Sequence, residues 1–143
     1  TVDSVLGQTV PPAEWIILRN GPVEADVEAV LARARSAAFV RVIDVAENAG
    51  IIGAMRLCLQ AATAAYLLPL DADDLLERDA LEVLASWASE HQADVVFSDE
   101  DLLTNDIPEH PFLRPGFDPV LHAESAYVWH ACLFRRDRAL AHA

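Results

Sequence analysis

Lysine is absent from this sequence: its ten basic residues are all arginines, set against 23 aspartates and glutamates, and the net charge is −13. Without lysine the chain has no P-loop lysine, no Schiff-base amine and no lysine-dependent phosphatase site. Such a negative charge argues against a nucleic-acid partner, because phosphate backbones require a basic surface. An anionic substrate would need local attraction from a metal ion, an arginine or a helix N-terminus.

Long apolar runs are also missing. No run approaches the roughly 18 residues of a membrane-spanning helix. Residues 1–6 have neither the basic start nor the long apolar core of a signal peptide. Only two cysteines occur, Cys58 and Cys132, and they lie far apart in the sequence. We therefore expect reduced core thiols in a cytoplasmic protein, with attachment to the membrane surface as an alternative.

What is present favours one folded domain over residues 1–143, because 53% of the residues are hydrophobic and no repeat or linker interrupts them. The sequence starts without methionine, as if inside an element, so we expect a fragment of a longer protein. Prolines break up the stretch after Ser98, and an extended segment is expected at 127–134. The regular elements predicted before that point are strands at 14–18, 39–43, 66–70 and 93–97 and helices at 23–34, 52–62 and 78–90.

This alternation of strands and helices predicts an α/β fold with a mostly parallel sheet flanked by helices. The apolar strand predicted at 66–70 runs directly into three carboxylates, Asp71, Asp73 and Asp74. A sheet delivers such residues to its carboxyl edge, where α/β proteins bind ligands. Crowded carboxylates repel one another unless a cation compensates, and Mg²⁺ often binds through carboxylates together with substrate phosphates. Two interpretations are open: a metal-assisted site for a phosphate-bearing ligand, or an Asp-rich turn that caps the next helix.

A second acidic segment, Ser98-Asp99-Glu100-Asp101, follows the strand predicted at 93–97. If the two strands are parallel, both acidic segments emerge at the same edge of the sheet. The alternative is a helix cap, since Ser98 followed three residues later by Asp101 fits a capping-box pattern. His122 and His130 have no acidic residue at metal-ligand spacing, so we expect them to be ordinary surface or core histidines.

Several segments taken together resemble family 2 of the nucleotide-sugar-dependent glycosyltransferases, especially rhamnosyltransferase-like and O-antigen-type members. The opening Ser4-Val5-Leu6-Gly7-Gln8-Thr9 is similar to a helix of the family. In the family this helix precedes a strand that begins with Glu and continues as an apolar run, here residues 14–17. Residues 61–74 are similar to the block that ends in the family's DxD motif, here Asp71-Ala72-Asp73. The resemblance follows the chain in order through residues 4–9, 14–17, 48–51, 61–74, 93–101, 111–119 and 127–136.

The resemblance implies a GT-A (Rossmann-like) fold, a nucleotide-diphosphate sugar donor and a saccharide or lipid-linked acceptor. It also implies Mg²⁺ or Mn²⁺ as cofactor and inverting transfer to a hydroxyl, in the synthesis of a cell-surface polysaccharide. Asp73 would be the main metal ligand, Asp71 would face the metal or the ribose, and Asp74 would orient the loop. Asn20, at the end of the first predicted strand, would belong to the donor-binding site.

The sequence also departs from the family pattern. The family's usual first strand is missing, Arg19 stands where a base-contacting Asp is common, and the usual catalytic base would lie beyond Ala143. Asp99, Glu100 and Asp101 are then the remaining catalytic candidates. We expect residues 1–143 alone to transfer sugar at a rate near background, and the strand edge left unpaired to favour self-association. The alternative function is a degenerate domain of the same fold that binds or assembles without transfer.

Overall fold

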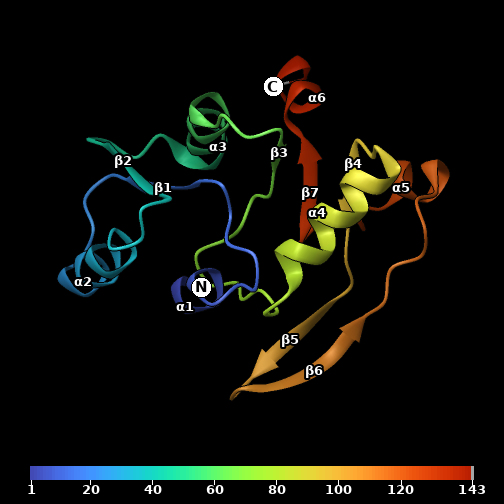
Figure 1. The fold of residues 1–143 in the computed structure, drawn as a ribbon, viewed down its shortest axis with the longest axis horizontal. Coiled ribbons are helices and arrows are strands. Elements are labelled where there is room, and N and C mark those ends of the chain that lie inside the picture. Colours follow the sequence, from blue (N-terminus) through green and yellow to red (C-terminus); the bar gives the residue numbers. More distant parts are fainter. Residues whose placement is uncertain (143) are drawn as a thin grey trace.

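A computed structural model describes residues 1–142, which form an α/β arrangement (Figure 1). Every strand and helix predicted from the sequence is present, with bounds shifted by a few residues. The elements are α1 (Val2–Leu6), β1 (Trp15–Asn20), α2 (Ala25–Ala34), β2 (Val40–Val45), α3 (Gly50–Ala61), β3 (Tyr66–Leu67), α4 (Ala80–His91), β4 (Val95–Phe97), β5 (Glu100–Thr104), β6 (Ile107–Phe112), α5 (Pro119–Glu124), β7 (Cys132–Arg135) and α6 (Arg136–Ala141).

The first two strands form a parallel pair, as expected for strands joined by a helix. β1 and β2 are in register from Trp15 opposite Val40 to Asn20 opposite Val45. α2 makes the connection and buries Leu31 and Ala34, which lie three positions apart on one helical face. α3 packs against β1. This unit therefore follows directly from the predicted alternation of strands and helices.

The second sheet has the order β3-β7-β4, and β7 is antiparallel to both of its neighbours. β3 and β4 therefore run in the same direction, as the sequence predicts, but they are not adjacent. β3 is short because its ladder with β7 ends at Leu67 and because Pro69 has no N–H to extend it. The sequence indicated an extended segment at 127–134; it did not show that this segment would enter the sheet between two earlier strands.

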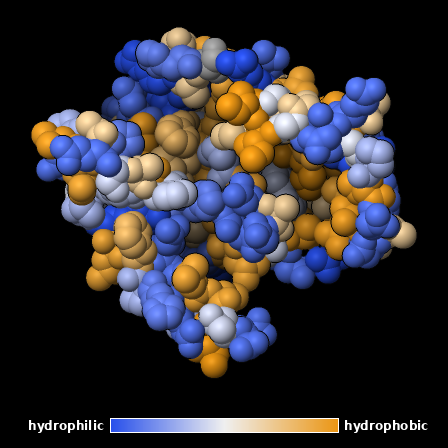
Figure 2. Space-filling model, turned by 180° about the vertical axis from the view of Figure 1, so that it is seen from behind, coloured by the Kyte–Doolittle hydropathy of each residue, from blue (hydrophilic) through white to orange (hydrophobic). Residues whose placement is uncertain are grey.

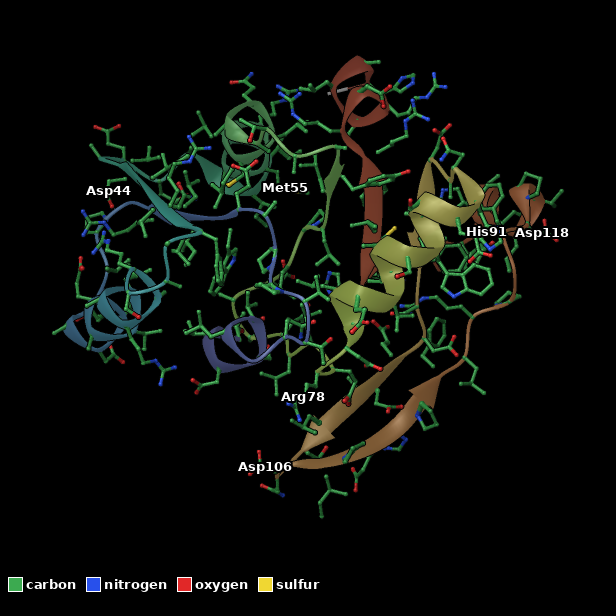
Figure 3. The ribbon with its side chains drawn as sticks, viewed as in Figure 1. Asp44, Met55, Arg78, His91, Asp106 and Asp118 are labelled. Atoms are coloured by element: carbon green, nitrogen blue, oxygen red, sulfur yellow. The ribbon has the colours of Figure 1, made fainter. Side chains whose placement is uncertain are left out.

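The stretch after Ser98, in which the prolines predict irregular structure, contains a β-hairpin. β5 and β6 pair antiparallel around Asn105 and Asp106, whose φ angles of 51° and 64° suit a tight two-residue turn. The hairpin extends away from the rest of the molecule, with Asp106 at its tip (Figures 1 and 3). The capping-box interpretation of Ser98 and Asp101 is wrong, because β5 and not a helix begins there.

The core is small and lies where α4 covers the second sheet. Leu84 and Ala88 of α4 pack on Leu133 of β7, with Tyr66, Leu68, Val96 and Ala131 around them. Trp87 is 56% exposed and packs against His91 at the solvent face of α4. Apolar side chains also lie in patches among polar ones on the molecular surface (Figure 2). Within residues 1–142, no helix combines the length and the apolar character that crossing a bilayer requires.

Both cysteines are free thiols, as the sequence predicts. Burial raises the pKa of Cys132 to about 11 and also raises the pKa of the half-buried Cys58. Neither thiol therefore has the lowered pKa that marks a reactive cysteine.

Glu14 joins the two sheets at their amino-terminal sides. Its carboxylate, just before β1, accepts hydrogen bonds from the backbone N–H and hydroxyl of Thr63 and from the N–H of Ala64, just before β3. Arg41 of β2 lies 3.5 Å from the other carboxylate oxygen. The backbone hydrogen bond from Thr63 is the largest of the effects that lower the pKa of Glu14 below its ordinary value.

We predict that Glu14→Gln lowers the free energy of unfolding at pH 7 by ~1–2 kcal/mol, since hydrogen bonds to a charged group are lost or weakened. Because the folded protein lowers this pKa, the stabilisation is present above the unfolded pKa and disappears as pH falls through the folded one. Urea titrations at several pH values should show the difference between wild type and variant shrinking in acid. Glu90→Gln, at an exposed glutamate of α4, is the matched control. A difference that is independent of pH would contradict the assignment.

Candidate functional site

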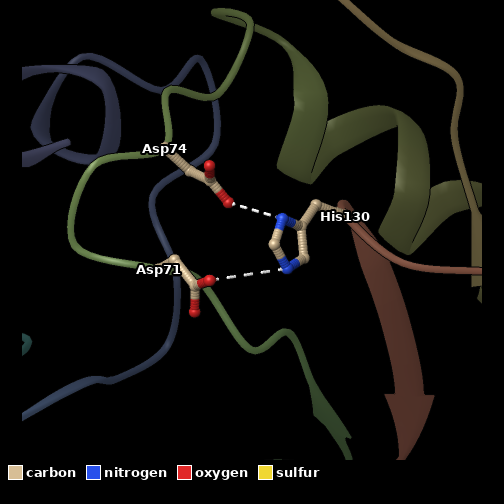
Figure 4. A group of neighbouring side chains, drawn as sticks. All are labelled: Asp71, Asp74 and His130. Atoms are coloured by element: carbon tan, nitrogen blue, oxygen red, sulfur yellow. Dashed lines mark ion pairs between the residues drawn. The ribbon is translucent and has the colours of Figure 1, made fainter. Parts of the chain in front are cut away.

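Two carboxylates and an imidazole meet where the chain leaves β3 (Figure 4). Nδ1 of His130 lies 2.9 Å from Oδ2 of Asp74, and Nε2 of His130 lies 3.7 Å from Oδ2 of Asp71. One ligand atom from each residue lies within 4.8 Å of the others. Asp71 is exposed, whereas Asp74 and His130 are half-buried. Oδ2 of Asp74 is shielded from solvent and has no hydrogen-bond partner of suitable geometry among residues 1–142.

The loop that carries the two aspartates is held by the N-terminal segment. The hydroxyl of Thr1 donates to the carbonyl oxygens of Ala72 (2.6 Å) and Asp74 (2.7 Å). The amide side chain of the buried Gln8 donates to the Glu77 carbonyl at 2.7 Å. The same side chain accepts from the N–H of Leu81 at 3.0 Å. Residues on both sides of α1 thus hold residues 72–81 in place.

The turn at 71–74 does not cap the next helix. The N-cap position of α4 is Asp79, and its side chain makes no capping hydrogen bond. The interpretation of the Asp-rich turn as a helix cap is therefore wrong. What the turn does is direct Asp71 and Asp74 towards a residue from the far end of the chain.

His130 reaches the two aspartates because β7 lies between β3 and β4. The backbone N–H of Ser98 donates to the Ala131 carbonyl at 3.1 Å, which extends the β4–β7 ladder by one step towards His130. The sequence predicts an ordinary surface or core histidine at 130, because no acidic residue stands at metal-ligand spacing from it; the structure brings its imidazole to Asp71 and Asp74. A contact between segments so distant in sequence leaves no local spacing to recognise.

The second acidic segment lies at the same edge of the sheet. β3 and β4 run in the same direction, and Ser98 pairs with the residue that follows His130. Oδ1 of Asp99 accepts the backbone N–H of Arg114 at 2.7 Å. Oε1 of Glu100 lies 2.8 Å from Nη2 of Arg114. Asp101 is exposed on β5.

Two predicted residues lie outside the group of Figure 4. Asp73 is exposed on the same turn but does not belong to the cluster of ligand atoms. Asn20 uses its side chain within the fold: it accepts the N–H of Ala49 at 2.8 Å and donates to the Asn48 side chain at 3.0 Å. Asn20 therefore ties the end of β1 to the start of α3.

Arg19, which replaces a carboxylate common in the resembled family, is fully occupied by charge partners. It pairs with Glu28 of α2, and its Nε lies 2.8 Å from Oδ1 of Asp44 on β2. A hollow of about 360 Å³ lies beside it, bounded also by Gly21 and Pro22. The positive charge of Arg19 is thus balanced within the chain and is not left for a phosphate.

Comparison with known proteins identifies the family. The sequence model described as "Glycosyl transferase family 2" matches residues 1–101, a range that extends from α1 into β5. The match includes Asp71, Asp74 and the acidic segment that starts at Ser98, whereas His130 lies beyond it. A search of curated proteins finds no match to the chain. With most of its length matched, and with the α/β fold that this membership implies, the chain belongs to glycosyl transferase family 2.

Proposed function

We propose that this glycosyltransferase uses Asp71, Asp74 and His130 to hold a divalent cation, and through it the diphosphate of a nucleotide-sugar donor. The observation that carries the proposal is the meeting of the three side chains in Figure 4 at the carboxyl edge of the sheet. Ligands of open α/β sheets bind at that edge. Family membership supports glycosyl transfer in general; the identity of the ligands is our proposal.

The residues fit a metal ion chemically. Two carboxylates supply hard oxygen ligands, and the buried Oδ2 of Asp74 lies 2.9 Å from Nδ1 of His130 without hydrogen-bond geometry. Carboxylates suit Mg²⁺ and Mn²⁺, whereas an imidazole suits transition metals. The combination favours Mn²⁺ over Mg²⁺. Asp73, which the resemblance makes the main ligand, stays a proposed participant from the same turn.

A bound cation would offset the repulsion between an anionic donor and this acidic chain. A diphosphate carries negative charge into a protein whose net charge is −13 and whose loop 71–74 contains three carboxylates. Asp71, Asp74 and His130 would hold the cation, and the two carboxylates would supply the attraction for it. When bound, the cation acts as a Lewis acid that stabilises the charge developing on the departing nucleoside diphosphate.

The acceptor hydroxyl attacks from the face of the sugar opposite the leaving diphosphate, so the configuration at the anomeric carbon is inverted. A general base must take the proton of this hydroxyl. Asp99, Glu100 and Asp101 are our candidates at this edge. Glu100 is paired with Arg114, whereas Asp99 has one oxygen engaged by a backbone N–H and the other left over. We therefore favour Asp99. A saccharide or lipid-linked acceptor in cell-surface polysaccharide synthesis, at the cytoplasmic side, fits the family resemblance.

We predict that Mn²⁺ binds more tightly in the presence of a nucleoside diphosphate than alone, because the diphosphate supplies part of the coordination shell. Asp71→Asn and Asp74→Asn should each weaken this binding at least about 10- to 100-fold. That loss of metal affinity is typical when a residue that only supports a metal ligand is replaced. His130→Asn should weaken it as well, and Asp73→Asn less than Asp71→Asn. Isothermal titration calorimetry with Mn²⁺ and UDP, GDP or dTDP measures each affinity.

Asp106→Asn is the control for the loss of one negative charge, since Asp106 lies at the hairpin tip (Figure 3). Equal Mn²⁺–nucleotide binding by the wild type, Asp71→Asn and Asp74→Asn would remove the cluster from the donor site. A large loss of Mn²⁺–nucleotide affinity in Asp73→Asn with no loss in His130→Asn would instead support Asp73 as the main metal ligand, as the family resemblance implies.

Transfer itself can be tested with the full-length protein and a panel of sugar nucleotides. We expect Asp71→Asn to lower kcat/KM by about 100-fold or more, as the removal of one group that stabilises transition-state charge often does. Release of the nucleoside diphosphate in the presence of acceptor measures the rate. Wild-type transfer that persists unchanged in Asp71→Asn and Asp74→Asn would contradict the proposal.

A further inference from the structure

One arginine differs sharply from the others in its environment. The side chain of Arg114 is only 1% exposed, whereas each of the other arginines that forms an ion pair among residues 1–142 is at least 30% exposed. Burying a guanidinium is costly unless it is paired and its N–H groups are satisfied. The contacts of Arg114 therefore indicate which parts of the structure its burial holds together.

Its partners belong to the acidic segment after β4. The guanidinium donates through Nη1 to the Ser98 carbonyl, and Nη2 forms an ion pair with Oε1 of Glu100 at 2.8 Å without hydrogen-bond geometry. The backbone N–H of Arg114 donates to Oδ1 of Asp99 at 2.7 Å. A single residue thus contacts three consecutive residues, of which two are candidate catalytic carboxylates.

Arg114 also reaches the segment that leads to His130. Nε donates to the Tyr127 carbonyl at 2.7 Å, and the Tyr127 side chain is itself buried. The Tyr127 hydroxyl accepts the N–H of Asp118 at 2.7 Å. Ser98 in turn pairs with Ala131. The strand end that carries Asp99 and the segment that carries His130 are therefore held by one buried cation.

We propose that Arg114 is a positioning residue for glycosyl transfer: it sets the carboxylate of Asp99 on the acceptor side of the donor site. This inference rests on the proposed function. Glu100 balances the charge of the guanidinium, and Asp99 is oriented through one oxygen while its other oxygen is left for the acceptor hydroxyl. The planar fork of arginine is suited to bind a carbonyl and a carboxylate at once, which a lysine cannot reproduce.

The test compares the double variant R114M/E100Q, in which neither charge of the buried pair remains, with Glu100→Gln alone, which keeps the guanidinium and its hydrogen bonds to Ser98 and Tyr127, in the full-length protein. Relative to E100Q, we expect kcat to fall about 100-fold, as a misplacement of ~1 Å can cause. The donor KM and the Mn²⁺–nucleoside diphosphate affinity should stay within about threefold, since a loss confined to the transition state appears in kcat. Arg114→Lys should retain more thermal stability than R114M yet lose most of kcat. Arg138→Met, at an exposed arginine paired with Asp94, is the control.

Unchanged kcat in R114M/E100Q relative to E100Q would overturn the proposal, and so would a fall in kcat matched by an equal loss of donor affinity. Amide hydrogen exchange tests the positioning without any transfer. In R114M/E100Q the N–H groups of Ser98 and residue 114 should exchange faster than in E100Q, while those of α2 keep their rates. If the wild type transfers no sugar, the proposed function fails, and equal exchange at Ser98 and residue 114 in the two variants would then refute the role of Arg114 as well.

Discussion

The position of β7 between β3 and β4 determines where the candidate site residues meet. A strand that runs antiparallel to both neighbours brings its own start to the carboxyl ends of theirs. His130 precedes that start, and the acidic turn and the acidic segment follow those ends. The core contacts that hold β7 in place, Leu133 against Leu84 and Ala88 of α4, therefore also hold the site together.

The carboxylates at this edge of the sheet differ from several that are paired with arginines. Asp44 and Glu28 pair with Arg19, and Glu14 pairs with Arg41. At the edge, Arg114 pairs with Glu100, and within residues 1–142 the ion-pair partner of Asp71 and Asp74 is His130. Like charges held this close favour a cation, and the site is thus suited to an anionic ligand that brings one.

Local patterns in the sequence were sufficient for the elements that pack locally. The alternation of apolar strands and amphipathic helices predicted the parallel β1–β2 pair and the same direction of β3 and β4, because helical connections impose both. They could not predict the partner of β7, since pairing between distant segments depends on packing over the whole sheet. His130 and Arg114 were missed for this reason.

The hairpin around Asn105 and Asp106 was missed although two turn-forming residues mark it. The prolines of β6 indicated a break in regular structure, yet an exposed edge strand tolerates proline.

We propose above that a divalent cation shared with a nucleoside diphosphate lies between Asp71, Asp74 and His130. Pulsed electron paramagnetic resonance of the Mn²⁺–nucleoside diphosphate complex tests it most directly, because a coordinated imidazole nitrogen couples to the electron spin of Mn²⁺. We expect a ¹⁴N coupling in the wild type that disappears in His130→Asn and persists in His122→Asn. Nucleotide-bound Mn²⁺ with no ¹⁴N coupling in the wild type would contradict it.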